Sequence, residues 1–247
     1  MTIYEIEVEV VTLCDMNIQK SRLSVCNLID SALAKNSKLL EFHQSGNTKG
    51  YSFTWLLDGD KKIKHIKNIK YFKNRNVYRF KMRCISREIA EYLYETLETH
   101  GNNELKVITT KLRCINNPIV EHITTLTPMV LLNHNYWKEK MSFTSMTKEL
   151  NRKLIRRYNE LIYKDLPLDT KVIKSVILLN NKPIVFRGYG SSQYVCDMVK
   201  VVPENSELAN EIMTMALATG LGTKTSRGFG YVNYKEMKME VSSKNVS

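Results

Sequence analysis

The chain carries the order strand, helix, strand, strand, helix, strand twice, and this repeat limits its fold more than any other feature of the sequence. In the first copy, apolar residues alternate with glutamates over residues 3–11, as in a half-buried strand. The patterns that follow predict a helix, two strands, a helix and a strand at residues 21–35, 51–57, 77–85, 87–99 and 104–115. This is the order of a ferredoxin-like unit.

The second copy has a more elaborate beginning. An apolar segment at 119–132 and an extended segment at 135–142 come first. The later patterns predict a helix, two strands, a helix and a strand at residues 145–164, 171–179, 183–201, 206–219 and 229–234. Gly188-Tyr189-Gly190 breaks the strand pattern at 183–201. We therefore expect an α+β protein of two tandem ferredoxin-like (RRM-like) β-α-β-β-α-β domains. Their expected bounds are residues 1–117 and 118–240, followed by a disordered polar tail at 241–247.

Opposite charges are expected to face each other on the sheet of the first unit. The first and third strands of such a unit are antiparallel neighbours, and the charged residues concerned are Glu5, Glu7 and Glu9 on one strand and Arg79, Lys81 and Arg83 on the other. Cross-strand pairs of opposite charge stabilise a sheet modestly. We interpret the three basic residues as partners of the glutamates rather than as RNA ligands. The same face lacks the aromatic residues on which a standard RRM stacks bases.

The charge balance favours a polyanionic partner. A net charge of +12 with a pI near 9.4 points to nucleic acid first and to an anionic membrane second. The sequence contains no run of eighteen apolar residues, so we expect no membrane span. It also lacks a basic amphipathic helix with large exposed apolar residues, which argues against binding to a membrane surface. Without a signal-peptide pattern and with an odd number of cysteines, the chain is expected in the reducing cytoplasm.

Neither the cysteines nor the histidines have the spacing of a metal site. The five cysteines lie at positions 14, 26, 84, 114 and 196, and they form no Cys-x-x-Cys pair. The five histidines form no i, i+4 pair and no His-Glu-x-x-His motif. We therefore expect no structural or catalytic metal and no other cofactor.

Residues 220–230 read Gly-Leu-Gly-Thr-Lys-Thr-Ser-Arg-Gly-Phe-Gly. The stretch lies between an expected helix and the expected final strand, which is the wrong order for a Walker loop or a dinucleotide-binding loop. Exposed backbone N–H groups in such a loop, with Lys224 and Arg227 beside them, can bind an anion. The alternative is a glycine-rich turn that only packs.

Two basic units of this kind, with a Gly-apolar-Gly pair, five residues and a second Gly-apolar-Gly pair before the last strand, resemble the CRISPR-associated endoribonucleases of the Cas6 family. Thr127-Pro128-Met129-Val130 and the loop after the first helix support the resemblance, which covers nearly the whole chain. It implies two ferredoxin-like domains, binding of CRISPR repeat RNA, and metal-independent cleavage within each repeat.

Metal-free RNA cleavage needs a base for the attacking 2′-OH, an acid for the 5′-oxygen, and a cation near the phosphorane. The products are a 2′,3′-cyclic phosphate and a 5′-OH. Histidine, with an ordinary pKa of about 6.5, suits either proton role. The resemblance places a catalytic histidine at His43, in a polar loop expected over residues 36–50 after a left-handed cap at Asn36. It also places a phosphate-stabilising lysine at Lys49.

Alternatives stay open for both residues, because His43 could only cap a loop and Lys49 could be solvated. Some family members add a tyrosine on the first helix. This helix has none, and Asp30 and Ser31 lie nearby in the sequence. Ser45 and Tyr51 are the candidate substitutes for the third role.

RNA binding is expected to be mostly electrostatic. In the glycine-rich stretch we assign it to Gly220, Gly222, Lys224, Thr225, Ser226, Arg227, Gly228 and Gly230. Residues 61–87 contain eleven Lys or Arg and no acid, and there we assign it to Lys61, Lys62, Lys64 and Lys67, against the alternative of a solvated face. On the long helix, Arg152, Arg156 and Arg157 either extend this surface or contact another subunit.

The leading interpretation is a sequence-specific endoribonuclease that cuts CRISPR precursor RNA (precursor crRNA) within each repeat. The first alternative is a non-catalytic repeat-RNA-binding scaffold subunit of a CRISPR effector complex. The second is an unrelated tandem ferredoxin-like RNA-binding module or a binder of acidic membranes. Expected partners are repeat RNA and other effector-complex subunits, with no membrane, and a homodimer is left open.

Overall fold

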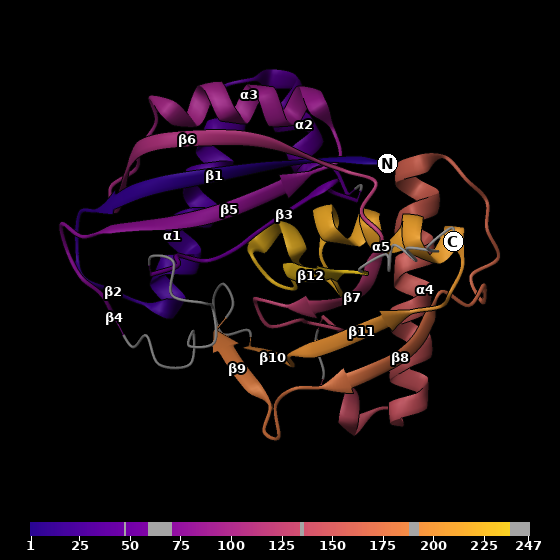
Figure 1. Ribbon diagram of the computed structural model, residues 1–247. Helices are drawn as coiled ribbons and strands as arrows, with labels where there is room; N and C mark the ends of the chain where they lie inside the picture. The colour runs from indigo at the N-terminus through magenta and orange to yellow at the C-terminus, as the bar shows by residue number, and fades with distance from the viewer. Residues whose placement is uncertain (47, 59–70, 134–135, 188–192, 238–247) are drawn as a thin grey trace, which may run out of the picture.

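Two four-stranded antiparallel sheets form the frame of the protein, and helix α5 (Glu207–Thr219) lies between them (Figure 1). The structure is a computed structural model that describes residues 1–46, 48–58, 71–133, 136–187 and 193–237. Because α5 packs on strands of both sheets, the two halves of the chain share one interface.

The first sheet has the strand order β3-β5-β1-β6. The strands are β1 (Thr2–Thr12), β3 (Tyr51–Phe53), β5 (Val77–Cys84) and β6 (Leu105–Asn116). Helices α1 (Ile18–Leu33), α2 (Ser37–Gln44) and α3 (Arg87–Glu98) share a core with the sheet, and β2 (Met16–Asn17) pairs with β4 (Tyr71–Phe72).

The second sheet has the strand order β12-β7-β11-β8. The strands are β7 (Val120–Thr125), β8 (Ile173–Leu178), β11 (Val199–Pro203) and β12 (Val232–Glu236). The remaining elements are α4 (Phe143–Ile162), the strand pair β9 (Ile184–Arg187) and β10 (Gln193–Cys196), and the 3-10 helices η2 (Trp137–Glu139) and η3 (Thr225–Arg227).

In each sheet the first and third strands of the β-α-β-β-α-β series are central neighbours, which confirms the prediction of tandem ferredoxin-like units. The boundary between residues 117 and 118 stays a prediction. The expected tail at 241–247 lies outside the described residues.

The prediction of an extended segment at 135–142 is wrong, because Trp137–Glu139 form a 3-10 helix. Trp137 is buried, and its indole N–H donates to Asp197 Oδ2 at 2.6 Å. The Tyr136 hydroxyl donates to Asp197 Oδ1 at 3.1 Å. This tertiary anchor, which no local pattern shows, sets the backbone here. The strand pattern expected at 183–201, with its break at Gly188-Tyr189-Gly190, is divided among β9, β10 and β11.

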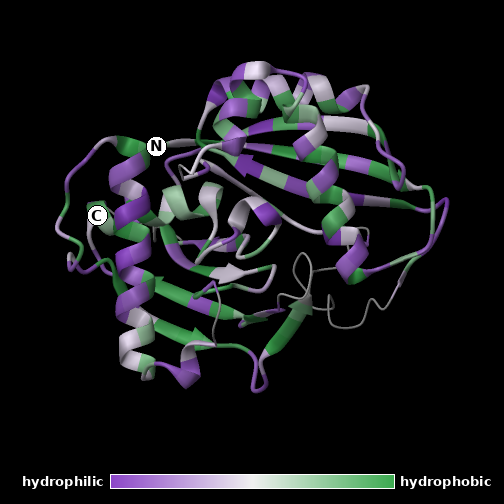
Figure 2. Ribbon diagram, turned by 180° about the vertical axis from the view of Figure 1, so that it is seen from behind, coloured by the Kyte–Doolittle hydropathy of each residue, from purple (hydrophilic) through white to green (hydrophobic). Residues whose placement is uncertain are grey.

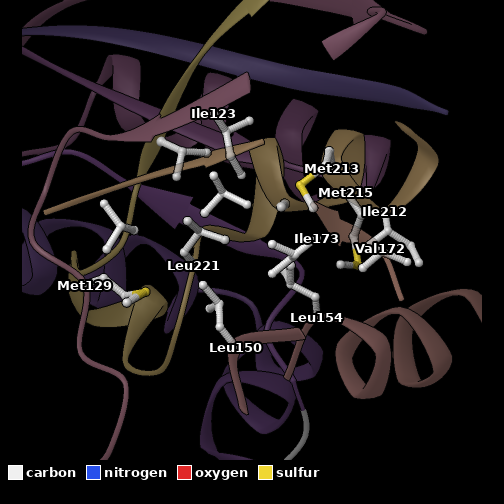
Figure 3. Close-up of a cluster of buried hydrophobic side chains, with 14 of the residues drawn as sticks. Ile123, Met129, Leu150, Leu154, Val172, Ile173, Ile212, Met213, Met215 and Leu221 are labelled. Atoms are coloured by element: carbon white, nitrogen blue, oxygen red, sulfur yellow. The ribbon is translucent and has the colours of Figure 1, made fainter. Parts of the chain in front are cut away.

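The core of the second unit forms between its sheet and the apolar sides of α4 and α5 (Figure 3). Leu150 and Leu154 of α4 and Ile212 of α5 are at most 1% exposed. Figure 3 also shows Leu221, from the glycine-rich stretch, within this cluster. The stretch is therefore anchored by an apolar side chain in the core.

Buried charges join the two halves of the chain. The register places Glu5 opposite Arg83, as predicted, and Arg83 Nε donates to Glu5 Oε2 at 2.6 Å. Arg83 Nη1 also donates to the carbonyl oxygen of Val232 at 2.8 Å, and the Tyr231 hydroxyl lies 3.3 Å from Glu5 Oε2. The pair is only 1–2% exposed because the second unit covers it. The charged face of the first sheet, which was expected to be open, is thus covered by the second unit around Glu5 and Arg83.

Burial alone would raise the pKa of Glu5, but the charges of Arg83, Lys81 and Arg113 outweigh it and hold the pKa below its ordinary value. With a folded pKa below the unfolded one, ionised Glu5 stabilises the fold at neutral pH. That contribution is lost as the pH falls through the folded pKa. The interface should therefore weaken in acid.

Replacing Arg83 by methionine should lower the free energy of unfolding by about 3 kcal/mol, because it leaves a buried carboxylate without its main partner. Urea unfolding followed by circular dichroism measures the loss. Arg79→Met is the matched control on the same strand, because Arg79 pairs with Glu7 at a more exposed position. It should cost less than about 1 kcal/mol. Equal losses in the two variants would contradict the role of the buried pair.

Candidate active site

His43 lies in the last turn of a helix, and the expectation of a polar loop over residues 36–50 is wrong for its first part. Asn36 has a φ of −113° rather than a left-handed one, and its side chain accepts hydrogen bonds from the backbone N–H groups of Lys38 and Leu39. It therefore begins α2 rather than ending α1. Leu39 is the one buried residue of this helix, so the sequence shows little apolar periodicity there.

Both ring nitrogens of His43 face side chains of the protein. Nδ1 lies 3.0 Å from the Tyr51 hydroxyl oxygen, and Nε2 lies 3.2 Å from Asp30 Oδ1. The His43 side chain is 11% exposed and Tyr51 is fully buried, whereas Asp30 is 26% exposed. Tyr51 thus occupies Nδ1 on the buried side of the ring, and Nε2 faces the partly exposed Asp30 side chain. Burial and the charge of Asp30 raise the pKa of Tyr51, so its hydroxyl is neutral and can donate or accept a hydrogen bond.

The Asp30 carboxylate connects His43 to the glycine-rich stretch. Its Oδ2 accepts a hydrogen bond from Arg227 Nη1 at 2.5 Å. Its Oδ1 is buried and accepts no aligned hydrogen bond, although His43 Nε2 is close. Burial disfavours the charge of Arg227, but contacts with Cys26 and Asp30 outweigh burial and raise its pKa. Residues from α1, α2 and η3 therefore meet in one cluster.

Cys26 and Ser31 take different positions around this cluster. Cys26 Sγ lies 3.3 Å from Arg227 Nη1. Burial and the Asp30 carboxylate raise the pKa of the Cys26 thiol to about 11, so it stays protonated at neutral pH. The Ser31 hydroxyl lies 2.8 Å from His100 Nε2 and so serves another contact. Of the candidate third residues, Tyr51 is the one that contacts His43.

Lys49 closes the C-terminal end of α2. Its Nζ donates to the carbonyl oxygens of Phe42 and Ser45 and to Ser45 Oγ at 3.2 Å, and it lies 4.7 Å from the centroid of the Phe42 ring. Lys49 is thus bound to the helix end rather than only solvated. Burial and then the charge of Arg227 lower its pKa, so the two cations lie in one neighbourhood.

The glycine-rich stretch needs its glycines for backbone conformation. All four have positive φ, with values of 74°, 75°, 82° and 65° at Gly220, Gly222, Gly228 and Gly230. A Cβ on Gly230 would lie 1.9 Å from the Leu221 carbonyl oxygen, and one on Gly222 would lie 2.3 Å from that of Val130. Three of the glycines are therefore close-packed against backbone and Gly228 against the side chains of Phe53 and Trp55, as the packing alternative proposed.

The expected anion-binding concavity is wrong for most of the N–H groups of the stretch, because they donate to carbonyl oxygens of the protein. The seven residues concerned are Gly220, Leu221, Thr223, Arg227, Gly228, Phe229 and Gly230. Bonds to Val130 and Pro128 tie the stretch to the second unit at 2.7 and 2.9 Å. The stretch is thus a rigid support for side chains rather than a cradle of free N–H groups.

Arg157 of α4 lies beneath this support. Its guanidinium donates to the carbonyl oxygens of Thr219, Gly220 and Gly222, the last at 2.6 Å. Burial lowers the pKa of Arg157 to about 10, which still leaves it charged at neutral pH. Arg157 therefore fixes the glycine-rich stretch, and whether it also extends an RNA surface stays a prediction. In the sequence, Arg157 lies among the basic residues of the polar side of this helix, so the sequence pattern did not predict that it binds the glycine-rich stretch.

Arg22 of α1 holds the stretch from the other side. It is 1% exposed, donates to the carbonyl oxygen of Arg227 at 3.1 Å, and lies 4.9 Å from the centroid of the Phe229 ring. Lys224 is exposed, Ser226 is half-buried and Thr225 is buried. Of these three assigned residues, Lys224 is the one best placed to reach a ligand.

A pocket of about 160 Å³ opens beside the stretch. Its lining residues are Thr48, Lys153, Arg156, Arg157, Glu160, Gly222 and Thr223. Lys153 pairs with Glu149 at 3.3 Å, and Thr48 donates to Glu160, whereas Arg156 is exposed. Lys153, Arg156 and Glu160 belong to α4, and Figure 2 shows hydrophilic residues along that helix. The pocket therefore lies between the segment after His43 and the basic side of α4.

The assigned residues Lys61, Lys62, Lys64 and Lys67 lie outside the described part of the chain, as do His65 and His134. Among the described residues, no three His, Cys, Asp or Glu side chains gather as metal ligands would. No helix in the same residues has the length and apolarity to cross a membrane.

Residues 115–234 match the family model described as CRISPR associated protein Cas6, C-terminal. A solved structure described as CRISPR associated protein Cas6 is similar to the chain, with a TM-score of 0.69 and 17% identity over 95% of this chain and 100% of that chain. A solved structure of a Cas6-related protein from Pyrococcus furiosus has a TM-score of 0.67 and 18% identity over 95% of this chain and 99% of that chain. No curated protein sequence matches the chain.

A third solved structure, described as an RAMP protein binding different RNA substrates, has a TM-score of 0.65 and 18% identity over 94% of this chain and 100% of that chain. At these identities the structural similarity shows a shared fold.

Replacing Gly230 by alanine should lower the free energy of unfolding by more than about 2 kcal/mol, because the new Cβ would collide with the Leu221 carbonyl at an unfavourable φ. Thermal unfolding measures this. Gly46→Ala is the control, because a Cβ there meets nothing within 4 Å. A Gly230→Ala protein as stable as Gly46→Ala would contradict the packing role of the stretch.

Proposed function

Residues 115–234 match the Cas6 family of CRISPR-associated proteins, and the whole chain has the fold of Cas6 structures; on that premise we propose that the chain is a Cas6 protein and a metal-independent endoribonuclease. It binds CRISPR repeat RNA and cuts precursor crRNA within each repeat. The 2′-OH attacks the adjacent phosphate, and the products carry a 2′,3′-cyclic phosphate and a 5′-OH.

One observation carries the proposal. The His43 imidazole lies beside Asp30, which binds the Arg227 guanidinium, and Arg227 acts electrostatically on Lys49. A proton-transfer group next to two cations is what 2′-OH attack requires, since charge develops on the phosphate while protons move at its oxygens. Arg227 comes from the glycine-rich stretch, so the stretch contributes directly to this cluster.

Each side chain has a role in this proposal. His43 is the general base or acid, and Nε2 is its reacting nitrogen because the Tyr51 hydroxyl occupies Nδ1. Tyr51 is a positioning residue, since its buried hydroxyl holds Nδ1 at 3.0 Å and sets the ring orientation. Arg227 and Lys49 stabilise the phosphate, which requires Lys49 to leave part of its contact with the end of α2.

RNA binding follows from the charge of the chain and from its exposed basic residues. The net charge is +12, and two basic residues near the site are exposed: Lys224 in the stretch and Arg156 on α4. A protein of the same fold is described as binding different RNA substrates. Binding to other effector-complex subunits, a homodimer, and location in the cytoplasm stay predictions.

A second candidate function is that of a non-catalytic RNA-binding scaffold subunit. Its support is that both His43 nitrogens and the Lys49 ammonium have partners within the protein in this structure. A cleavage assay separates the two candidates.

Wild-type protein should cut a radiolabelled cognate CRISPR repeat RNA in the presence of EDTA. His43→Ala should slow single-turnover cleavage by about 10²- to 10⁴-fold with little change in affinity, because a general acid or base is lost. His122→Ala is the control, since His122 pairs with Glu121 on β7 and lies outside the cluster.

Three outcomes would decide against parts of this proposal. Full activity of His43→Ala removes His43 from the mechanism. Cutting of RNA with a 2′-deoxy group at the cleavage site removes the 2′-OH attack. Binding of the repeat by wild type without any cleavage favours the scaffold function.

Lys224→Ala should weaken RNA binding and reduce the slope of log affinity against log salt by about 0.7, the value for one phosphate contact to a single strand. Filter binding across a salt series measures it. Lys171→Ala is the matched control, because Lys171 is exposed but already paired with Glu204 at 2.6 Å. An unchanged slope in Lys224→Ala would exclude a phosphate contact there.

A further inference from the structure

The Asp30 carboxylate occupies the place of an anion between donors. Arg227 Nη1 lies 2.5 Å from Oδ2, His43 Nε2 lies 3.2 Å from Oδ1, and the Cys26 thiol lies 3.7 Å from Oδ2. A phosphate group is recognised by the same geometry, because guanidinium groups bind carboxylate and phosphate oxygens alike. The protein thus holds one of its own carboxylates where an RNA phosphate would find a guanidinium and an imidazole together.

The carboxylate is incompletely satisfied at this place. Its Oδ1 is buried without an aligned hydrogen bond, which is costly for an ionised oxygen. The Asp30 side chain is nevertheless 26% exposed, and that of Arg227 is 36% exposed, so the ion pair is open to solvent on one side. A rotation about the Asp30 Cα–Cβ bond moves the carboxylate without moving α1. Exchange for a better-bound anion is therefore feasible.

We propose that Asp30 is a place-holder for an RNA phosphate, which takes its position between Arg227 and His43 when RNA binds. The proposal rests on the proposed function in one respect, that RNA is the incoming anion. On binding, Arg227 exchanges the carboxylate for a phosphate, and His43 Nε2 loses its internal partner and faces the RNA. The contact is thus autoinhibitory in the RNA-free protein.

This exchange has a measurable consequence for counterions. When a phosphate displaces Asp30 from Arg227, the phosphate releases its condensed cation, but the freed Asp30 carboxylate takes up a cation in its place, so the net release is small. Without the charge of Asp30 no cation is taken up, and the contact of Arg227 with the phosphate gives a net release.

Asp30→Asn keeps the shape of the side chain and removes its charge. Its affinity for a mixed-sequence, 2′-O-methylated single-stranded RNA, which cannot be cut by 2′-OH attack, is measured between about 50 and 200 mM salt. Relative to wild type, the slope of log affinity against log salt should steepen by about 0.7. Binding at low salt should tighten about fivefold, the factor for one partly exposed ion pair.

Arg227→Gln provides the matched background. There the Asp30→Asn substitution should leave the slope unchanged, because the cation that Asp30 neutralises is absent. If thermal unfolding shows that Asp30→Asn does not fold, Asp30→Ser is measured in the same way, since it removes the same charge in a smaller side chain.

An unchanged slope in the folded Asp30 variant overturns the proposal, as does a steeper slope that persists without Arg227. An unchanged slope together with cleavage slowed more than about tenfold would instead make Asp30 a positioning residue for His43. If Asp30→Asn shows the expected change in slope but wild type never cuts a repeat in EDTA, the endoribonuclease proposal fails while the place-holder stands.

Discussion

The buried pair of Glu5 and Arg83 determines where everything else lies. It needs cover from water, and α5 with the segment after it provides that cover, since Arg83 also binds the Val232 carbonyl. The Ser52 hydroxyl donates to the carbonyl oxygen of Ala218 at 2.7 Å and fixes the end of α5 on β3. The chain that leaves α5 must therefore run past α1 and β3, which are the elements that carry Asp30 and Tyr51.

Because the chain after α5 runs past α1 and β3, the glycine-rich stretch can bring Arg227 to Asp30 in the candidate active site. Arg157 binds its carbonyl oxygens from below, Leu221 anchors it in the core, and Arg22 holds it against α1. These contacts leave little freedom to the backbone around η3. Arg227 can therefore meet Asp30 at a defined distance, and a cluster shared by two units becomes as rigid as one built on a single helix.

Local patterns predicted the element order, the tandem fold and the pairing of Glu5 with Arg83, because alternation and helical periodicity are properties of neighbouring residues. They did not predict α2, which buries only one residue, or the burial of the charged sheet face by another unit. The contacts of Asp30 and Arg157 were also missed, because their partners lie far away in the sequence. The sequence thus predicted candidate site residues but not the residues that contact them.

The Asp30–Arg227 contact joins residues that are 197 positions apart. Protein synthesis adds roughly 5–20 residues per second, and a domain on the N-terminal side generally folds as its own unit before the rest emerges. A growing chain therefore presents the imidazole and the carboxylate well before it acquires the guanidinium. Synthesis itself orders the assembly of the site, because Arg227 is made long after Asp30 and His43.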